Sequence, residues 1–213
     1  MTPLTELKPT AERRIRAAKP FVRMSPIELC RWMWITWAAI WLLWALRTKR
    51  AQTRLNAGSA LSYMVPMLLG SWLFFAERRI LVRLGLWWPS IPQPPWLMWL
   101  GAAVTFVGLA FAIWARLYLG KNWSGLVQVK QDHELIRTGP YRFVRHPIYS
   151  GILLALIGTT LCRRNVWGFV GVALVWFGLW LKSRLEERFM VETFGTEYDH
   201  YRHTTGALIP RLR

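Results

Sequence analysis

The sequence has 213 residues, of which 54% are hydrophobic, and its mean hydropathy is +0.21. A water-soluble domain of this length would be less apolar and would spread its charges evenly along the chain. The formal net charge is +17, from 28 Lys and Arg against 11 Asp and Glu. These basic residues lie in short clusters between apolar runs, which is typical of residues that flank membrane spans and disfavours a nucleic-acid-binding protein. We therefore expect an all-α integral membrane protein whose partner is the lipid bilayer, with no nucleic-acid partner.

Residues 1–29 are polar and basic, and we expect a tail that is either disordered or lies along the membrane surface. Five apolar runs follow, and flanking Trp and Arg side chains can extend each toward the length that a bilayer requires. The sequence thus predicts about five transmembrane helices, three within residues 30–119 and two within residues 120–213. The runs cover residues 32–46, 60–76, 96–115, 148–162 and 166–181.

Small residues within these runs predict close contacts between helices. Gly101 and Gly108 are seven residues apart on one helix face, and three further glycines are interpreted in the same way: Gly168, Gly171 and Gly178. Cys30 and Cys162 lie at or inside apolar segments, so we interpret both as buried free thiols, with a disulfide as the less favoured alternative.

The short connection at residues 163–165 predicts that residues 148–181 form a helical hairpin. A hairpin returns the chain to the membrane face where it started, so residues 121–145 and 182–213 should lie on the same face. Seven of the eleven acidic residues and all four histidines fall within residues 132–203. We expect the functional site on this face, and a small excess of Lys and Arg there predicts that it is cytosolic.

The first polar cluster is the sequence LIRTGPYRFVRHPIYSG at residues 135–151. Pro147 suits the first turn of a helix, and this leaves the backbone N–H groups of Ile148 and Tyr149 free to bind a carboxylate. An interfacial loop with a belt of Arg and Tyr is the alternative. The convergence of His146 with Tyr and Arg residues at a helix start favours a binding site.

The second cluster follows the last apolar run. Helical spacing allows ion pairs of Lys182 with Glu186 and of Arg184 with Glu187. These could be ordinary surface pairs, but two adjacent carboxylates beside the first cluster favour a site that stabilises a cation and leaves a basic residue for an anionic substrate. The histidines lack the spacing of metal ligands, so we expect no metal site.

Taken together, RTGPYRFVRHPIYSG, a hydrophobic hairpin, RLEE and FGTEY resemble the isoprenylcysteine carboxyl methyltransferase family, which is related to the phospholipid methyltransferases. The resemblance covers about residues 120–213 and implies that they form a methyltransferase core. It also implies S-adenosyl-L-methionine as the cofactor, S-adenosyl-L-homocysteine as its product, and a lipophilic or prenylated substrate that enters from the bilayer.

The resemblance further implies roles for particular residues. The implied cofactor contacts are Gln128, His133, Glu134, Leu135, Ile136, Tyr141, His146, Pro147, Ile148, Tyr149 and Glu186. The implied catalytic residues are Lys182, Arg184, Glu186 and Glu187. Either Lys182 or Arg184 would hold the substrate carboxylate.

The predicted activity is O-methylation of an isoprenylcysteine-like carboxylate, which is already ionised and needs no general base. A lipid amine or a thiol is the alternative acceptor, and it would need His146, Glu186 or Glu187 as a base. An NADPH-dependent membrane reductase of the isoprenoid or sterol type is a second alternative, which the carboxylate pair disfavours. A non-enzymatic scaffold would leave the clustering of acids and histidines unexplained.

Overall fold

The structure is a computed structural model that describes residues 24–45, 57–76, 78–86, 91–120 and 135–211. The predicted basic tail lies, up to residue 23, outside the described residues. The regular elements of the described part are α2 (Pro26–Ala45), α3 (Ala57–Phe75), α4 (Arg78–Arg83), α5 (Pro95–Leu119), the 3-10 helix η2 (Gly139–Arg142), α6 (Pro147–Arg163), α7 (Val166–Phe194) and α8 (Thr196–Thr204). The predicted all-α class is confirmed.

All five predicted apolar runs are helices, namely α2, α3, α5, α6 and α7. Three of them contain stretches that are long and apolar enough to cross a bilayer, while α6 is apolar but shorter. These stretches are Gly58–Phe75, Pro95–Leu119 and Val166–Phe194. Helix α7 continues past the predicted end at residue 181 because neither Gly nor Pro interrupts it before Gly195, whose φ of 52° ends the helix.

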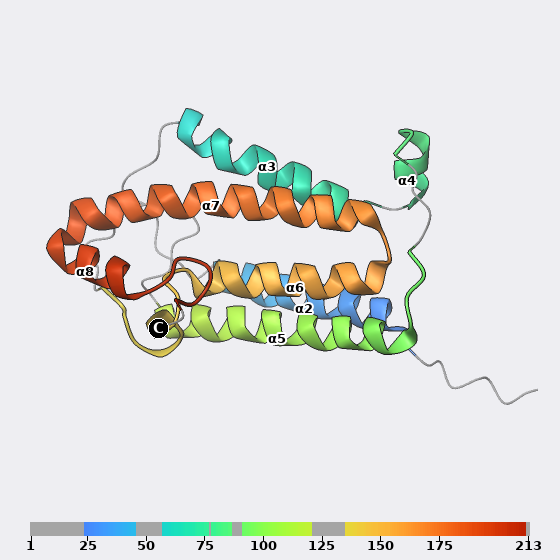
Figure 1. The fold of residues 1–213 in the computed structure, drawn as a ribbon, viewed down its shortest axis with the longest axis horizontal. Coiled ribbons are helices and arrows are strands. Elements are labelled where there is room, and N and C mark those ends of the chain that lie inside the picture. The colour runs from blue at the N-terminus through green and yellow to red at the C-terminus, as the bar shows by residue number, and fades with distance from the viewer. Residues whose placement is uncertain (1–23, 46–56, 77, 87–90, 121–134, 212–213) are drawn as a thin grey trace, which may run out of the picture.

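The helices form two layers (Figure 1). Helix α5 packs along α6 with α2 beside them, and α3 packs along α7. The connection between α6 and α7 lies at one end of the bundle, where Arg164 adopts a left-handed φ of 55°. The N-terminus of α6, the C-terminus of α7 and the whole of α8 lie at the opposite end. The predicted hairpin is therefore confirmed, and it brings the two polar clusters to the same end.

Glycines allow the helices within each layer to touch backbone to backbone. A Cβ atom on Gly108 would lie 2.5 Å from the Ala155 nitrogen, and one on Gly158 would lie 2.5 Å from the Thr105 nitrogen. In the other layer, a Cβ atom on Gly171 would lie 2.7 Å from the Gly70 oxygen. The predicted close approaches are confirmed, and they fix the distance between the helices that carry the site.

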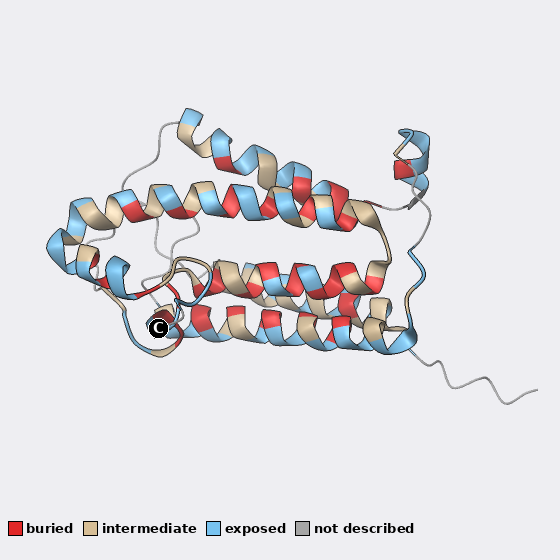
Figure 2. Ribbon diagram, viewed as in Figure 1, coloured by how far each residue is buried: buried red, intermediate tan, exposed pale blue. Residues whose placement is uncertain are grey.

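The buried residues are distributed between the two helix layers and do not form a single globular core. Buried residues lie on the helix faces that meet within each layer, whereas the outward faces are exposed and rich in large apolar side chains such as Leu42, Leu68 and Phe106 (Figure 2). Outward apolar faces are what a helix presents to lipid. Cys30 and Cys162 are buried free thiols with their sulfur atoms 3.6 Å apart, as predicted.

Substituting Gly158→Ala should lower the free energy of unfolding by about 1–3 kcal/mol, because the added methyl group forces α5 away from α6. Thermal unfolding of the detergent-purified protein measures this. Gly58→Ala is the matched control, since a Cβ atom there meets nothing within 4 Å. Equal unfolding temperatures for the two variants would contradict the tight contact.

Candidate active site

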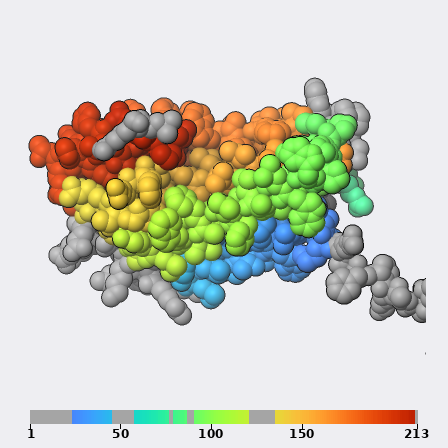
Figure 3. All heavy atoms as spheres, turned by 60° about the horizontal axis from the view of Figure 1, so that its bottom comes forward, coloured from blue at the N-terminus to red at the C-terminus, as the bar shows by residue number. Residues whose placement is uncertain are grey.

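The site is built where α6 begins. His146 is the N-cap of α6, with Pro147 at its first position. The chain just before α6 pairs with the C-terminal segment: the Arg145 N–H donates to the Gly206 oxygen at 2.9 Å, and the His146 N–H donates to the Ala207 oxygen at 3.0 Å. The space-filling view shows the region around residues 135–147 against the C-terminal region at the same end of the molecule (Figure 3). Two segments distant in sequence thus fix the position of His146.

The imidazole of His146 lies between two adjacent carboxylates of α7. Its Nδ1 is 3.4 Å from Glu186 Oε2, and its Nε2 is 3.2 Å from Glu187 Oε1. Burial alone would lower the pKa of His146, but the hydrogen bonds and charges of the two carboxylates outweigh burial and raise this pKa above its usual value. This shift favours the protonated imidazole, whose charge offsets the repulsion between the two carboxylates.

Glu186 faces the side of the array that adjoins α6 and α3. The Tyr149 hydroxyl donates to its Oε1 at 2.6 Å, and Lys182 Nζ is 3.8 Å from the same oxygen. The Tyr149 ring stacks on His146 with 5.4 Å between ring centroids. Lys182 Nζ also lies 5.3 Å from the ring centroid of Tyr149 and 5.8 Å from that of Tyr63. The predicted ion pair of Lys182 with Glu186 is confirmed.

Glu187 faces the other side and is held by Arg145. Both Nε and Nη2 of Arg145 contact Glu187 Oε1, at 2.9 and 2.8 Å. Arg145 Nη1 also donates to the backbone oxygens of Arg202 and Thr205. The ion pair that spacing allowed between Arg184 and Glu187 does not form, because Arg145 occupies that carboxylate and Arg184 lies over the Trp180 ring instead.

The remaining predicted cofactor residues are placed in part. Tyr141 is buried in a cluster with Ile148 and Ala115, with Ile136 at its edge. Its carbonyl oxygen accepts a hydrogen bond of 2.5 Å from the Tyr201 hydroxyl. Leu135 is half-buried, and Pro147 is buried. Gln128, His133 and Glu134 lie outside the described residues.

Three features of this site had no individual role predicted from the sequence: Arg145, Tyr63 and the C-terminal segment that starts at Thr205. Arg145 had a signal, because it precedes His146 directly and a basic residue beside a carboxylate pair is an expected partner. Tyr63 and the C-terminal segment reach the site only through the fold, and nothing local in their sequence indicates it.

This structure defines a class: an all-helical membrane protein with a buried ion-pair array at one end of its bundle. Comparison with known protein families identifies a narrower group of similar proteins within this class. Residues 96–197 match the phospholipid methyltransferase family. The chain is 32% identical to the yeast Saccharomyces cerevisiae protein-S-isoprenylcysteine O-methyltransferase over 117 residues, which are 52% of this chain and 48% of that protein. It is 30% identical to the human protein of the same name over 157 residues, which are 72% of this chain and 53% of that protein.

A solved structure is also similar. The eukaryotic intramembrane Ras methyltransferase, isoprenylcysteine carboxyl methyltransferase, superposes with a TM-score of 0.50 at 27% identity, over 73% of this chain and 54% of that chain. All three comparisons agree with the resemblance predicted from the sequence: the chain is similar to the isoprenylcysteine carboxyl methyltransferases, and residues 96–197 match the phospholipid methyltransferase family. It spans about half the length of the curated yeast and human relatives that it matches.

Substituting Glu187→Gln should lower the free energy of unfolding by about 3–5 kcal/mol, because it leaves buried cations without their counter-charge. The Arg145–Glu187 side chains are only 9% and 11% exposed. Glu197→Gln is the control, since its ion pair with Arg137 is 44% and 51% exposed and should contribute at most about 1 kcal/mol. Denaturation in detergent measures the free energy of unfolding of both variants. Similar losses of stability would mean that the array contributes no more to stability than an exposed surface pair.

The array should also make stability depend on pH through His146. Because the pKa of His146 is raised in the folded state, its contribution is fully present below the unfolded pKa of about 6.5 and is lost as pH rises through the folded pKa. The difference in unfolding temperature between the parent and His146→Gln should thus be largest at acidic pH and shrink as pH rises. A constant difference from pH 6 to 9 would show that His146 is not held as the cation.

Proposed function

We propose that this chain is an S-adenosyl-L-methionine-dependent methyltransferase of the membrane, which methylates the carboxylate of a lipophilic, isoprenylcysteine-like substrate at its cytosolic face. The observation that carries the proposal is the array itself. It holds two carboxylates, an imidazole and a lysine together at the end of a bundle with membrane-length helices. Similarity to isoprenylcysteine O-methyltransferases supports this choice of substrate.

The chain's residues fit the proposed cofactor, which combines a carboxylate with an ammonium and a sulfonium group. The first turn of α6 offers the N–H groups of Ile148 and Tyr149, which have no partner within the helix. Glu186 offers a carboxylate to the positive groups, and Tyr149 orients that carboxylate. When bound, S-adenosyl-L-methionine supplies an electrophilic methyl group.

Lys182 is the better candidate for holding the substrate carboxylate. It lies on the same helix face as Glu186 and against the Tyr149 ring, beside the proposed cofactor residues. Arg184 is exposed and lines a separate pocket on another face of α7. Lys182 would fix the substrate anion near the first turn of α6, while the aromatic rings of Tyr63 and Tyr149 restrict water beside it.

The charged form of His146 favours a methyl acceptor that is already ionised. His146 shares its two ring nitrogens between Glu186 and Glu187, and in its charged form it cannot accept a proton. A carboxylate needs no base, whereas an amine or thiol does. Methylation of a lipid amine remains a second candidate, because the matching family model is that of phospholipid methyltransferases. In that reaction Glu186 would be the base.

The test has a binding arm and an activity arm. Titration of the detergent-purified protein with S-adenosyl-L-homocysteine should show saturable binding that Glu186→Gln weakens at least about tenfold, or about 1.4 kcal/mol. The isosteric control Glu197→Gln should bind normally. Failure of the folded parent to bind, together with an unfolding-temperature shift by NADPH, would favour the reductase alternative.

The activity arm compares an N-acylated S-prenylcysteine with phosphatidylethanolamine as methyl acceptors, by mass spectrometry. We expect a methyl ester on the first and no product from the second. Lys182→Gln should raise KM for the prenylcysteine more than it weakens S-adenosyl-L-homocysteine binding. Methylation of the amine alone would overturn the carboxylate assignment and establish the lipid-amine candidate.

A further inference from the structure

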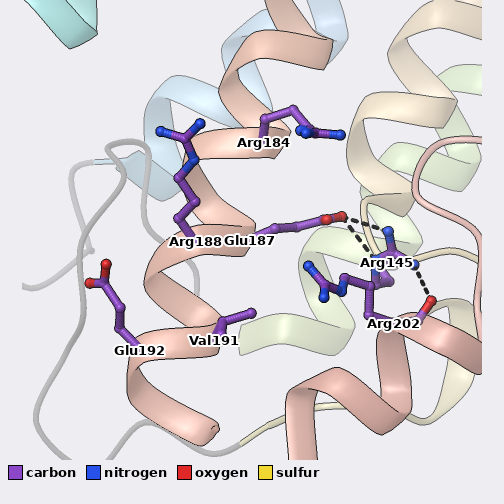
Figure 4. A pocket seen from close by; sticks show the side chains of 7 residues that line it. All are labelled: Arg145, Arg184, Glu187, Arg188, Val191, Glu192 and Arg202. Atoms are coloured by element: carbon purple, nitrogen blue, oxygen red, sulfur yellow. Dashed lines mark hydrogen bonds and ion pairs between the residues drawn. The ribbon is translucent and has the colours of Figure 1, made fainter. Parts of the chain in front are cut away.

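A pocket of about 460 Å³ lies beside the Arg145–Glu187 ion pair (Figure 4). It is formed by the C-terminal half of α7, the side chain of Arg145 and the α8 residue Arg202. Figure 4 shows Arg184 and Arg202 on either side of the Glu187 carboxylate, with the side chains of Arg188 and Glu192 at the other edge of the pocket. The lining residues are Arg145, Arg184, Glu187, Arg188, Val191, Glu192 and Arg202.

The pocket has more positive charge than its carboxylates offset. Arg145 and Glu187 neutralise each other in its wall. Arg202 pairs with Asp199 at 2.8 Å, but both side chains are more than 40% exposed, so this pair contributes little energy and a ligand can compete for Arg202. Arg184 and Arg188 are both exposed, and neither has a carboxylate within ion-pair distance in the described part of the chain.

The spacing of these two arginines points to a ligand between them and their neighbours. Arg184 and Arg188 are four residues apart on α7, where like charges repel and disfavour the helix. A second pocket of about 370 Å³ shares Arg145 and Arg202 with the first and adds Arg211. Arginines from α7, α8 and the C-terminal segment therefore line two neighbouring pockets.

We propose that this arginine pocket binds a phosphate group, carried either by an anionic phospholipid headgroup or by a soluble phosphate. The planar guanidinium group, with its several N–H donors, matches phosphate oxygens, and several arginines together can neutralise the charge of a phosphate. Arg184 lies over the Trp180 ring, with the guanidinium carbon 5.7 Å from the ring centroid. Trp180 is 39% exposed and lies near the end of the apolar run at residues 166–181. An exposed Trp at the end of an apolar run is typical of the headgroup level, where lipid phosphates are.

This phosphate site is separate from the proposed methyl-transfer site. The ion-pair array of His146, Glu187 and Arg145 stands between the pocket and Glu186. A bound phosphate would connect α7 to α8 across the sharp bend at Gly195, where φ is 52°. The pocket would thus anchor the C-terminal part of the chain at the membrane surface whatever reaction the array supports.

The test measures binding of three probes to the full chain in neutral detergent without S-adenosyl-L-methionine: short-chain phosphatidylglycerol, short-chain phosphatidylcholine and inorganic phosphate. We expect saturable phosphatidylglycerol binding that Arg184→Gln with Arg188→Gln weakens at least about tenfold. The double Lys variant at the same positions should regain part of this affinity, because it restores the charges without the planar forks. Circular dichroism and gel filtration check that each variant is folded.

The matched control is Arg79→Gln with Arg83→Gln, another exposed pair four residues apart, on α4 at the opposite end of the bundle. It should leave binding unchanged. Binding of inorganic phosphate alone, with the same dependence on the pocket arginines, would support the phosphate site and identify a soluble source. Equal losses in both double variants, phosphatidylcholine binding that equals phosphatidylglycerol binding, or no binding of any probe would overturn the proposal.

Discussion

Two adjacent carboxylates, Glu186 and Glu187, must be neutralised at the end of a helix that is apolar along most of its length. Consecutive residues of a helix point about 100° apart, so the two carboxylates face different directions. A single cation can contact both of them at close range only if it has two separate donor atoms. The imidazole of His146 meets this requirement, with one ring nitrogen toward each carboxylate. Lys182 and Arg145 add one further cation on each side. Removing any partner would leave a buried charge uncompensated, which costs far more than the pair itself contributes.

This electrostatic requirement explains how α6 and α7 are held together at the site end, although they pack little against each other along the hairpin. Each packs mainly on a helix outside the hairpin, α6 on α5 and α7 on α3, through glycine contacts. At the site end, the array and the C-terminal segment connect the two layers. The Ser150 hydroxyl donates to the Leu208 oxygen at 2.6 Å, and Leu208 packs on the apolar cluster that includes Leu153 of α6 and Leu179 of α7. Polar contacts thus hold the two layers together at the end of the bundle that carries the proposed site, and close backbone packing holds the helices together elsewhere.

Features encoded by neighbouring residues could be predicted from the sequence, and those that depend on long-range contacts could not. The apolar runs, the hairpin and the glycine contacts follow from composition and spacing. The pair of Lys182 with Glu186 also follows, because both residues are on one helix face. The pairing of Glu187 was predicted incorrectly, since Arg184 was in helical register but Arg145, 42 residues away, is nearer in space. Tyr63 and the C-terminal segment reach the site by tertiary packing, which leaves no periodic signal.

The positions of Lys182 and Arg184 around the axis of α7 distinguish two residues that the sequence offered as equal candidates for holding the substrate carboxylate. Lys182 and Arg184 are two residues apart, so their side chains point to nearly opposite sides of the helix. Lys182 lies with Glu186 four residues on, and Arg184 lies with Arg188 four residues on. The first pair is half-buried, with Lys182 against tyrosine rings, where one charge can be fixed precisely. The second pair is exposed beside an open pocket, where several charges attract an anion. One helix can therefore position a reacting group on one face and contact the membrane surface on the other, with His146, Glu187 and Arg145 as the partition between them.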